Sequence, residues 1–190
     1  MDTNESPMRI VVADDHALVR GGVGILIKIL YPDTQLVECN SYEKTISALT
    51  SNEDVDLLLL DLLMPGMESI ASVRHICSTW PDLPVIVVSV REDAQTIREA
   101  LRAGAMGYIP KTSAPEVAIN AIRLVLSGGI YVPPDVLQLT GSDIASAETE
   151  ASAGGEQGRR SVRELHGLTN RQEDVMNLIS EGRSNKEIAS

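Results

Sequence analysis

The chain has 190 residues, of which 43% are hydrophobic and 23% charged, and its formal net charge is −11. This composition is ordinary for a globular protein and excludes a disordered chain as the main interpretation. The acidic balance argues against an extended basic surface for nucleic acid or anionic membrane, although it leaves room for a small basic module. The length predicts one domain with a proper core and a smaller second domain.

The N-terminus and the cysteines indicate the cellular compartment of the protein. The first residues, MDTNESPMR, lack the basic start and apolar run of a signal peptide, and no apolar stretch approaches the ~18 residues of a membrane helix. Cys39 and Cys77 form no C-x-x-C pair, so they indicate neither a disulfide framework nor a zinc site, and we expect both to be core or half-buried. The sequence therefore predicts a protein of the reducing cytoplasm that does not bind membranes.

Short β-rich runs alternate with helical patterns between residue 9 and about residue 127, which predicts right-handed βαβ crossovers. The predicted strands span residues 10–13, 35–39, 56–60, 85–89 and 107–109. The predicted helices span residues 17–30, 42–49, 69–80, 93–103 and 115–126. The pattern is typical of the α/β class, with a doubly wound, five-stranded parallel sheet.

The third β-rich run is the centre of this organisation. Its leucines, residues 57–60, show no polar alternation, which is typical of a strand buried on both faces. The turn Met64-Pro65-Gly66 then ends the run, because proline removes a donor and glycine permits the positive φ that a tight turn often needs. Asp61 is therefore expected at the carboxyl end of a central strand, which is the edge where open α/β sheets bind ligands.

The first predicted helix contains Gly21, Gly22 and Gly24. Glycine inside a helix costs up to ~1 kcal/mol relative to alanine, so we expect close packing to compensate for it. The indication that this GGVG segment is a nucleotide-binding loop is weak. It lies several residues after its strand, and Ile27 stands where the dinucleotide fingerprint needs a third glycine.

The sequence changes character after Gly128 and Gly129. In IYVPPDVLQL, residues 130–139, two prolines interrupt a helix while the apolar residues predict a strap that lies against the first domain. Residues 140–160 are rich in glycine, serine, alanine and glutamate. That composition buries too little apolar surface for a core and predicts a flexible linker.

The last segment, LTNRQEDVMNLISEGRSNKEIA, predicts a helix, a turn and the start of a second helix. Thr169 or Asn170 is a suitable N-cap for the first helix, and Ser184 for the second. The expected organisation is thus a first domain, a strap with a linker, and a partial all-α unit, at residues 8–130, 131–160 and 161–190.

Polar residues stand at the carboxyl ends of four of the predicted strands: Asp14 and Asp15 at the first, Asp61 at the third, Ser89 at the fourth and Lys111 just after the fifth. In a sheet of order 2-1-3-4-5 the first and third strands are neighbours, so three carboxylates converge. Like charges this close repel unless a cation or proton intervenes, and an oxygen-rich site suits Mg²⁺. Each residue alone has a commoner structural role. As a set they indicate a phosphoryl site with a carboxylate nucleophile, a metal, a hydroxyl and a fixed cation.

The histidines are weaker candidates. His16 follows the acidic pair and could ligate a metal, but we expect it to point away, capping a helix or solvated. His75 and His166 have no partners in the sequence.

The segments ADDH, DLLMPGM, VVSVRED and GYIPKTS, in this order and spacing, resemble the receiver domain of bacterial two-component response regulators. With the last segment included, the chain resembles the NarL/FixJ type, which carries a LuxR-type helix-turn-helix. The receiver resemblance covers about residues 8–130 and implies a flavodoxin-like sheet of order 2-1-3-4-5.

The resemblance also implies a role for each polar residue at the sheet edge. Asp61 would be the phosphoacceptor, and Asp14 and Asp15 would hold Mg²⁺ together with it. Ser89 and Lys111 would contact the phosphoryl group. The aromatic residue that reorients together with Ser89 would be Tyr108.

The chain departs from many receivers at two positions. Val90 follows the switch hydroxyl where many have alanine, which is expected to narrow access to the phosphoryl group. Thr112 follows Lys111 where many have proline, and Pro110 precedes it instead, so the peptide after the lysine need not share the usual cis geometry.

We expect a transcriptional response regulator and not an enzyme. A sensor histidine kinase would phosphorylate Asp61, phosphorylation would promote a homodimer, and the C-terminal domain of the complete protein would bind promoter DNA. One alternative is a haloacid-dehalogenase-like phosphohydrolase, whose nucleophile would instead follow the first strand in a D-x-D arrangement. Another is a receiver that acts only through protein contacts.

The 190-residue chain itself is expected not to read DNA sequence. The resemblance places the recognition helix after the helix that begins at Ser184, beyond Ser190. Residues 161–190 carry four basic and five acidic side chains, a net charge of −1, so phosphate contacts would be scarce.

Overall fold

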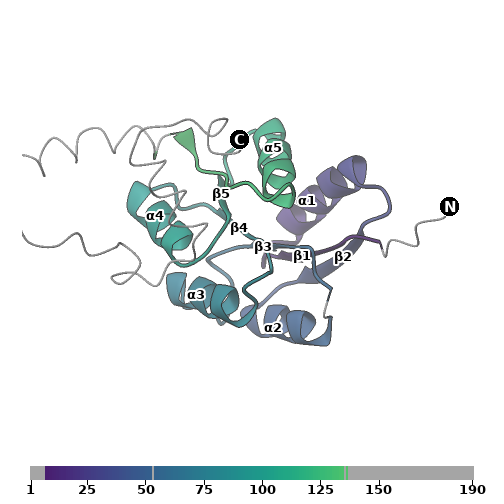
Figure 1. Ribbon diagram of the computed structural model, residues 1–190, viewed down its shortest axis with the longest axis horizontal. Helices are drawn as coiled ribbons and strands as arrows, with labels where there is room; N and C mark the ends of the chain where they lie inside the picture. Colours follow the sequence, from purple (N-terminus) through teal and green to yellow (C-terminus); the bar gives the residue numbers. More distant parts are fainter. Residues whose placement is uncertain (1–6, 53, 135, 137–190) are drawn as a thin grey trace, which may run out of the picture.

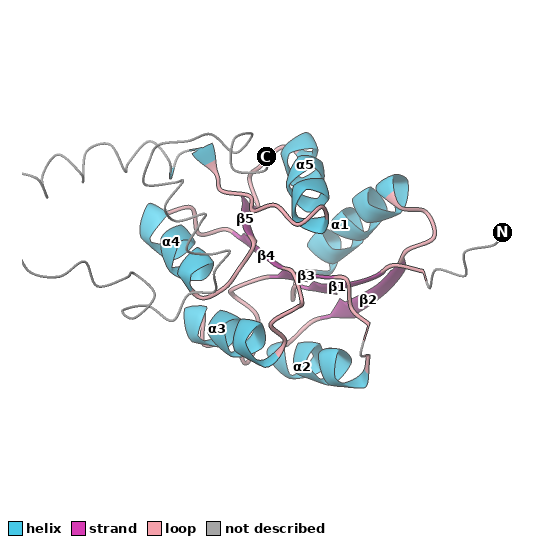
Figure 2. Cartoon of the chain, viewed as in Figure 1, coloured by secondary structure: helices cyan, strands magenta, loops and turns pink. Residues whose placement is uncertain are grey.

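The computed structural model describes residues 7–52, 54–134 and 136. Strands and helices alternate along this part of the chain (Figures 1 and 2). In chain order the elements are β1 (Arg9–Ala13), α1 (Ala17–Leu30), β2 (Gln35–Cys39), α2 (Tyr42–Ser51), β3 (Leu57–Leu60), α3 (Ile70–Thr79), β4 (Val85–Ser89), α4 (Ala94–Arg102), β5 (Gly107–Pro110) and α5 (Pro115–Leu126). Each predicted strand and helix in the described part is present, with its ends within two residues of the prediction.

The sheet has the order β2-β1-β3-β4-β5, and its strand pairs are all parallel. This confirms the predicted flavodoxin-like topology. The register pairs Ala13 with Leu60, so β1 and β3 end at the same level. The residues that follow these two strands therefore leave the sheet side by side.

The helices cover both faces of the sheet, α1 and α5 on one and α2, α3 and α4 on the other (Figure 1). Successive strand residues enter opposite layers of the core, because side chains alternate across a strand. Leu58 and Leu60 pack in the layer under α2, α3 and α4, whereas Leu57 and Leu59 pack in the layer under α1 and α5. The four leucines are at most 2% exposed, which explains why the sequence of β3 has no polar alternation.

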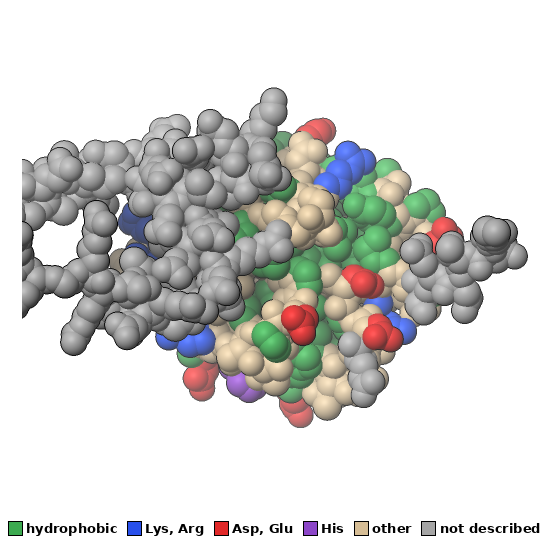
Figure 3. Space-filling view, in the orientation of Figure 1, with side chains coloured by type: hydrophobic (Ala, Val, Ile, Leu, Met, Phe, Trp, Pro, Cys, Tyr) green, Lys and Arg blue, Asp and Glu red, His purple; other side chains and the backbone are tan. Residues whose placement is uncertain are grey.

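The prediction that close packing compensates for the glycines of α1 is right at Gly24 only. A Cβ on Gly24 would lie 3.3 Å from Cδ1 of Leu36, whereas a Cβ on Gly21 or Gly22 would meet nothing within 4 Å. These two glycines lie on the exposed side of α1, together with the exposed large apolar side chain of Ile25. Figure 3 shows hydrophobic side chains reaching the surface on this side of the molecule.

The first part of the predicted strap packs beside β5. The amide of Tyr131 donates to the carbonyl of Met106 at 2.9 Å, and the side chains of Ile130, Val132 and Val136 are buried. Residues 137–190 lie outside the described residues. The linker, the helix-turn-helix and the domain boundaries in that part stay predictions.

Two further sequence predictions concern the cysteines and the membrane. Cys39 is buried and Cys77 is half-buried, and both are free thiols. Within the described ranges, no helix has both the length and the apolar character needed to cross a bilayer.

Candidate functional site

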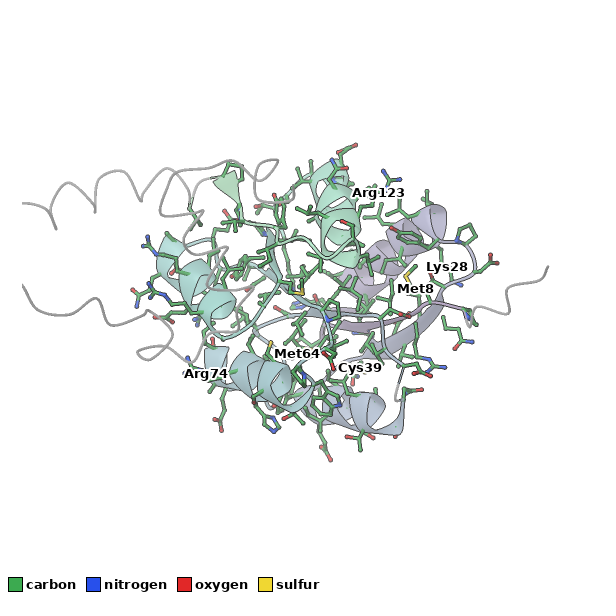
Figure 4. The ribbon with its side chains drawn as sticks, viewed as in Figure 1. Met8, Lys28, Cys39, Met64, Arg74 and Arg123 are labelled. Carbon is green, nitrogen blue, oxygen red and sulfur yellow. The ribbon has the colours of Figure 1, made fainter. Side chains whose placement is uncertain are left out.

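Asp61 leaves the end of β3 and is buried in the middle of the carboxyl edge. Its side chain is 1% exposed, and its backbone amide donates to the carbonyl of Ala13 at 2.9 Å. Carboxylate oxygen Oδ1 accepts a hydrogen bond from the amide of Leu63 at 3.2 Å, and Oδ2 accepts one from Lys111 Nζ at 2.9 Å. In Figure 4, the labelled side chains of Cys39 and Met64 lie near this edge.

Asp14 and Asp15 leave the end of the neighbouring strand β1. The Asp14 side chain is 4% exposed, and its Oδ1 accepts a hydrogen bond from the amide of His16 at 2.8 Å. The Asp14 amide donates to the carbonyl of Cys39, which ties the loop to β2. The Asp15 side chain is 34% exposed, so solvent reaches the site from this side.

Lys111 joins the two buried carboxylates. Its Nζ lies 2.7 Å from Oδ2 of Asp14 and 2.9 Å from Oδ2 of Asp61, while its amide donates to the carbonyl of Ser89. Burial by itself would lower the pKa of the ammonium, but the hydrogen bonds and charges of Asp14 and Asp61 outweigh it and raise the pKa above 10.5. By formal charge, the three carboxylates and the one ammonium leave the cluster with two uncompensated negative charges.

The donor set fits a divalent cation. One ligand atom from each of Asp14, Asp15, His16 and Asp61 can be chosen so that all lie within 4.8 Å of one another. Carboxylate oxygens are the ligands that Mg²⁺ prefers, and the exposed flank leaves room for the waters that Mg²⁺ retains.

The prediction that His16 points away from the carboxylates is wrong. Its Nδ1 lies 2.7 Å from Oδ1 of Asp15 and 3.3 Å from Oδ1 of Asp14. The side chain is 66% exposed, as expected of a solvated histidine, but it makes no capping hydrogen bond to α1. The physical reason is that the fold places two carboxylate oxygens, which are strong hydrogen-bond acceptors, within reach of the imidazole.

Ser89, the last residue of β4, and Tyr108, within β5, are both fully buried and uncharged. Ser89 Oγ accepts a hydrogen bond from the amide of Arg91 at 3.2 Å, and the Tyr108 hydroxyl donates to the carbonyl of Arg91 at 2.6 Å. Burial raises the pKa of the Tyr108 hydroxyl. The loop after β4 is thus held by both hydroxyls.

A protein-family model for the response regulator receiver domain matches residues 10–123, and this stretch contains every residue placed at the site above. The chain belongs to the response regulator family. Among curated proteins, the glycerol metabolism activator of Pseudomonas putida is 32% identical over 189 residues, which cover 95% of this chain and 79% of that protein. The nitrate/nitrite response regulator protein NarL of Escherichia coli (strain K12) is 30% identical over 189 residues, which cover 98% of this chain and 82% of that protein.

Solved structures of response regulators agree with this assignment. A LuxR family two-component response regulator from Aurantimonas sp. SI85-9A1 is 28% identical, with a TM-score of 0.62 over 76% of this chain and 99% of that one. The isolated REC domain of RcsB from Salmonella enterica, solved in the presence of phosphomimetic BeF3-, is 25% identical, with a TM-score of 0.64 over 70% and 99%. The relatives named here are regulators, which agrees with the expectation of a LuxR/NarL-type response regulator.

The two departures from many receivers are both at the surface of this response regulator. Val90 is 57% exposed, and the hydroxyl of Thr112 hydrogen-bonds the carboxylate of Glu92. The described residues contain no cis peptide bond, so the peptide between Lys111 and Thr112 is trans.

The sequence did not predict one contact that shapes the loop after Asp61. The amide of Tyr42 donates to the carbonyl of Pro65 at 3.0 Å, and its hydroxyl lies 2.6 Å from Nδ1 of His75. Gly66 has a φ of 82°, and a Cβ there would lie 3.4 Å from Cβ of Tyr42. Tyr42 and His75 are 33 residues apart, so no local pattern in the sequence could have paired them.

Proposed function

We propose that this response regulator accepts a phosphoryl group on Asp61 from a sensor histidine kinase, with Mg²⁺ held by Asp14, Asp15 and Asp61. The observation that carries the proposal is the Lys111 ammonium, which bridges buried Asp14 and Asp61. A buried carboxylate beside a fixed cation and further acidic ligands is the arrangement that phosphoryl transfer to aspartate requires.

The chemistry follows from the charges. A carboxylate oxygen of Asp61 attacks phosphorus while the bond from phosphorus to the donor nitrogen breaks, which leaves an acyl phosphate on Asp61. The acidic cluster alone would repel the anionic donor, so positive charge is needed where the phosphoryl oxygens lie. Lys111 supplies one positive charge from the fold, and Mg²⁺ held by Asp14, Asp15 and Asp61 would supply the rest.

Ser89 and Tyr108 carry the second step of the proposal. The Ser89 hydroxyl can leave the Arg91 amide and donate to a phosphoryl oxygen, whereas Tyr108 fixes the same loop through the Arg91 carbonyl. Phosphorylation would therefore shift the populations of two arrangements on the face formed by α4 and β5. We take the arrangement with the Tyr108 ring buried, as in the structure, to be the inward one of the two. The proposed output of phosphorylation is a homodimer whose complete C-terminal domains bind promoter DNA.

Intact-mass measurement after incubation with acetyl phosphate and Mg²⁺ tests the phosphorylation step. We expect one phosphoryl group to be added to the wild-type chain and none to Asp61→Asn, which keeps the shape of the side chain but removes the nucleophile. Asp82→Asn, an exposed aspartate between α3 and β4, is the matched control and should label like the wild type. Equal labelling of Asp61→Asn would contradict the assignment, and excess EDTA should prevent labelling of the wild type.

A further inference from the structure

The His16 side chain faces the acidic cluster although nothing in helix α1 requires it to. His16 is the N-cap of α1, with extended backbone angles of φ −83° and ψ 107°, and its side chain makes no capping hydrogen bond. Its Nδ1 instead lies 2.7 Å from Asp15 and 3.3 Å from Asp14. A nitrogen donor therefore sits beside the carboxylates that are proposed to hold a divalent cation.

The spacing of the four side chains suits a shared ion. Ligands at ~2.1 Å from an octahedral ion are about 3.0 Å apart when adjacent and about 4.2 Å apart when opposite. The chosen ligand atoms of Asp14, Asp15, His16 and Asp61 lie within 4.8 Å of one another. Small rotations of Asp15 and His16, which are 34% and 66% exposed, would close the remaining difference without disturbing the core.

We propose that His16 is a nitrogen ligand of the divalent cation at this site. The inference rests on the proposed function only in taking the carboxylates as a cation site. Carboxylates and water suit Mg²⁺, whereas imidazole suits Co²⁺, Ni²⁺ and Zn²⁺. A mixed nitrogen and oxygen donor set raises the affinity of the site for these borderline cations more than its affinity for Mg²⁺. His16 is thereby a determinant of which cation the response regulator uses.

A simple ion pair between His16 and Asp15 has different consequences. Such a pair would leave no nitrogen bound to the metal, and its loss would change the affinity for all divalent cations by a similar factor. Direct ligation makes the effect of the substitution depend on the identity of the cation.

Pulsed EPR of Mn²⁺ bound to the full chain separates the two cases, because electron spin echo modulation detects nitrogen bound directly to the ion. We expect ¹⁴N coupling in the wild type and its loss in His16→Gln. His75→Gln is the matched control, since His75 lies on α3 and hydrogen-bonds Tyr42, and it should keep the coupling. Bound Mn²⁺ without ¹⁴N coupling in the wild type, or with coupling that survives in His16→Gln, would overturn the inference and leave the proposed function standing. Failure of Mn²⁺ to bind at all would contradict both.

Calorimetric titration gives a second, independent readout. His16→Gln is expected to weaken Co²⁺ binding by about tenfold or more and Mg²⁺ binding by much less. An equal loss for the two cations would show that His16 acts on the carboxylates and not on the ion, and would overturn the inference.

Discussion

The two sides of Asp61 differ in charge and in exposure to solvent. Asp14, Asp15 and His16 lie on one side of it, which we call the acidic side. The side chains of Asp15 and His16 are 34% and 66% exposed. On the other lies the hydroxyl side, formed by Ser89 and Tyr108, which are 0% exposed and uncharged. The acidic side is open to small ions, whereas the hydroxyl side is closed within the core.

This difference suits the two sides to different tasks. Clustered carboxylates need a cation, and an exposed flank lets one enter with its waters. Buried hydroxyls can exchange one hydrogen-bond partner for another at little cost, and close packing turns that exchange into a choice between discrete arrangements. We infer that the acidic side serves the chemistry of Asp61 and the hydroxyl side reports it. Lys111 contacts both, through its ammonium and through its amide to the Ser89 carbonyl.

Removing the Lys111 ammonium, which lies between the two sides, should have the largest effect on stability. Lys111→Met leaves the buried carboxylates of Asp14 and Asp61 without their partner, so we expect the free energy of unfolding to fall by about 3 kcal/mol in the presence of EDTA. Urea denaturation measures this value, and added Mg²⁺ should recover part of it. An unchanged midpoint would show that the ammonium does not stabilise the acidic side.

The pH dependence of that stabilisation has a definite sign. The pKa of Lys111 is raised in the folded protein above its ordinary value of 10.5. Its contribution is therefore complete at neutral pH and is lost only as the pH rises through the raised pKa. The difference in unfolding free energy between wild type and Lys111→Met should stay constant between neutral pH and about pH 9 and shrink in stronger alkali. A difference that disappears below pH 9 would contradict the raised pKa.

Ser89→Ala should separate phosphoryl uptake, which depends on the acidic side, from the response that depends on the hydroxyl side. The variant keeps Asp61 and the acidic side, so it should still take up the phosphoryl group, but it lacks the hydroxyl that would move toward it. Coupling between two sites is typically worth ~1–3 kcal/mol, which corresponds to a several-fold or greater change in affinity. We expect phosphorylation to strengthen self-association of the wild type by such a factor and to leave self-association of Ser89→Ala unchanged. Sedimentation velocity before and after phosphorylation measures the change. Association that still depends on phosphorylation would exclude Ser89 as the coupling group.

Tyr108→Phe should have the smallest effect. It removes the hydrogen bond from the Tyr108 hydroxyl to the Arg91 carbonyl and leaves the buried ring in place. We expect the free energy of unfolding to fall by about 1 kcal/mol, which denaturation in urea can resolve. A loss several times larger would mean that the hydroxyl organises more of the hydroxyl side than this one bond.

Periodicity and turn residues in the sequence were enough to predict the strands and helices, and the family resemblance supplied the strand order. The structure brings the predicted residues Asp14, Asp61 and Lys111 together, while the roles given to them stay predictions. The leucines of β3 and the Met64-Pro65-Gly66 turn mark a buried strand and its end without reference to any other part of the chain. The direction of His16 and the close packing expected at Gly21 and Gly22 were predicted wrongly, because both depend on which neighbours the fold supplies. Periodicity identifies the face of an element but not what covers it.

Borohydride trapping tests most directly whether Asp61 is the residue that accepts phosphate. Borohydride reduces an aspartyl phosphate to homoserine, and tandem mass spectrometry of the digested chain locates the converted residue. After incubation with acetyl phosphate and Mg²⁺, we expect conversion at Asp61, with Asp14 and Asp15 unmodified. Conversion at Asp14 or Asp15, or none in a chain that has gained a phosphoryl group by intact mass, would contradict the account.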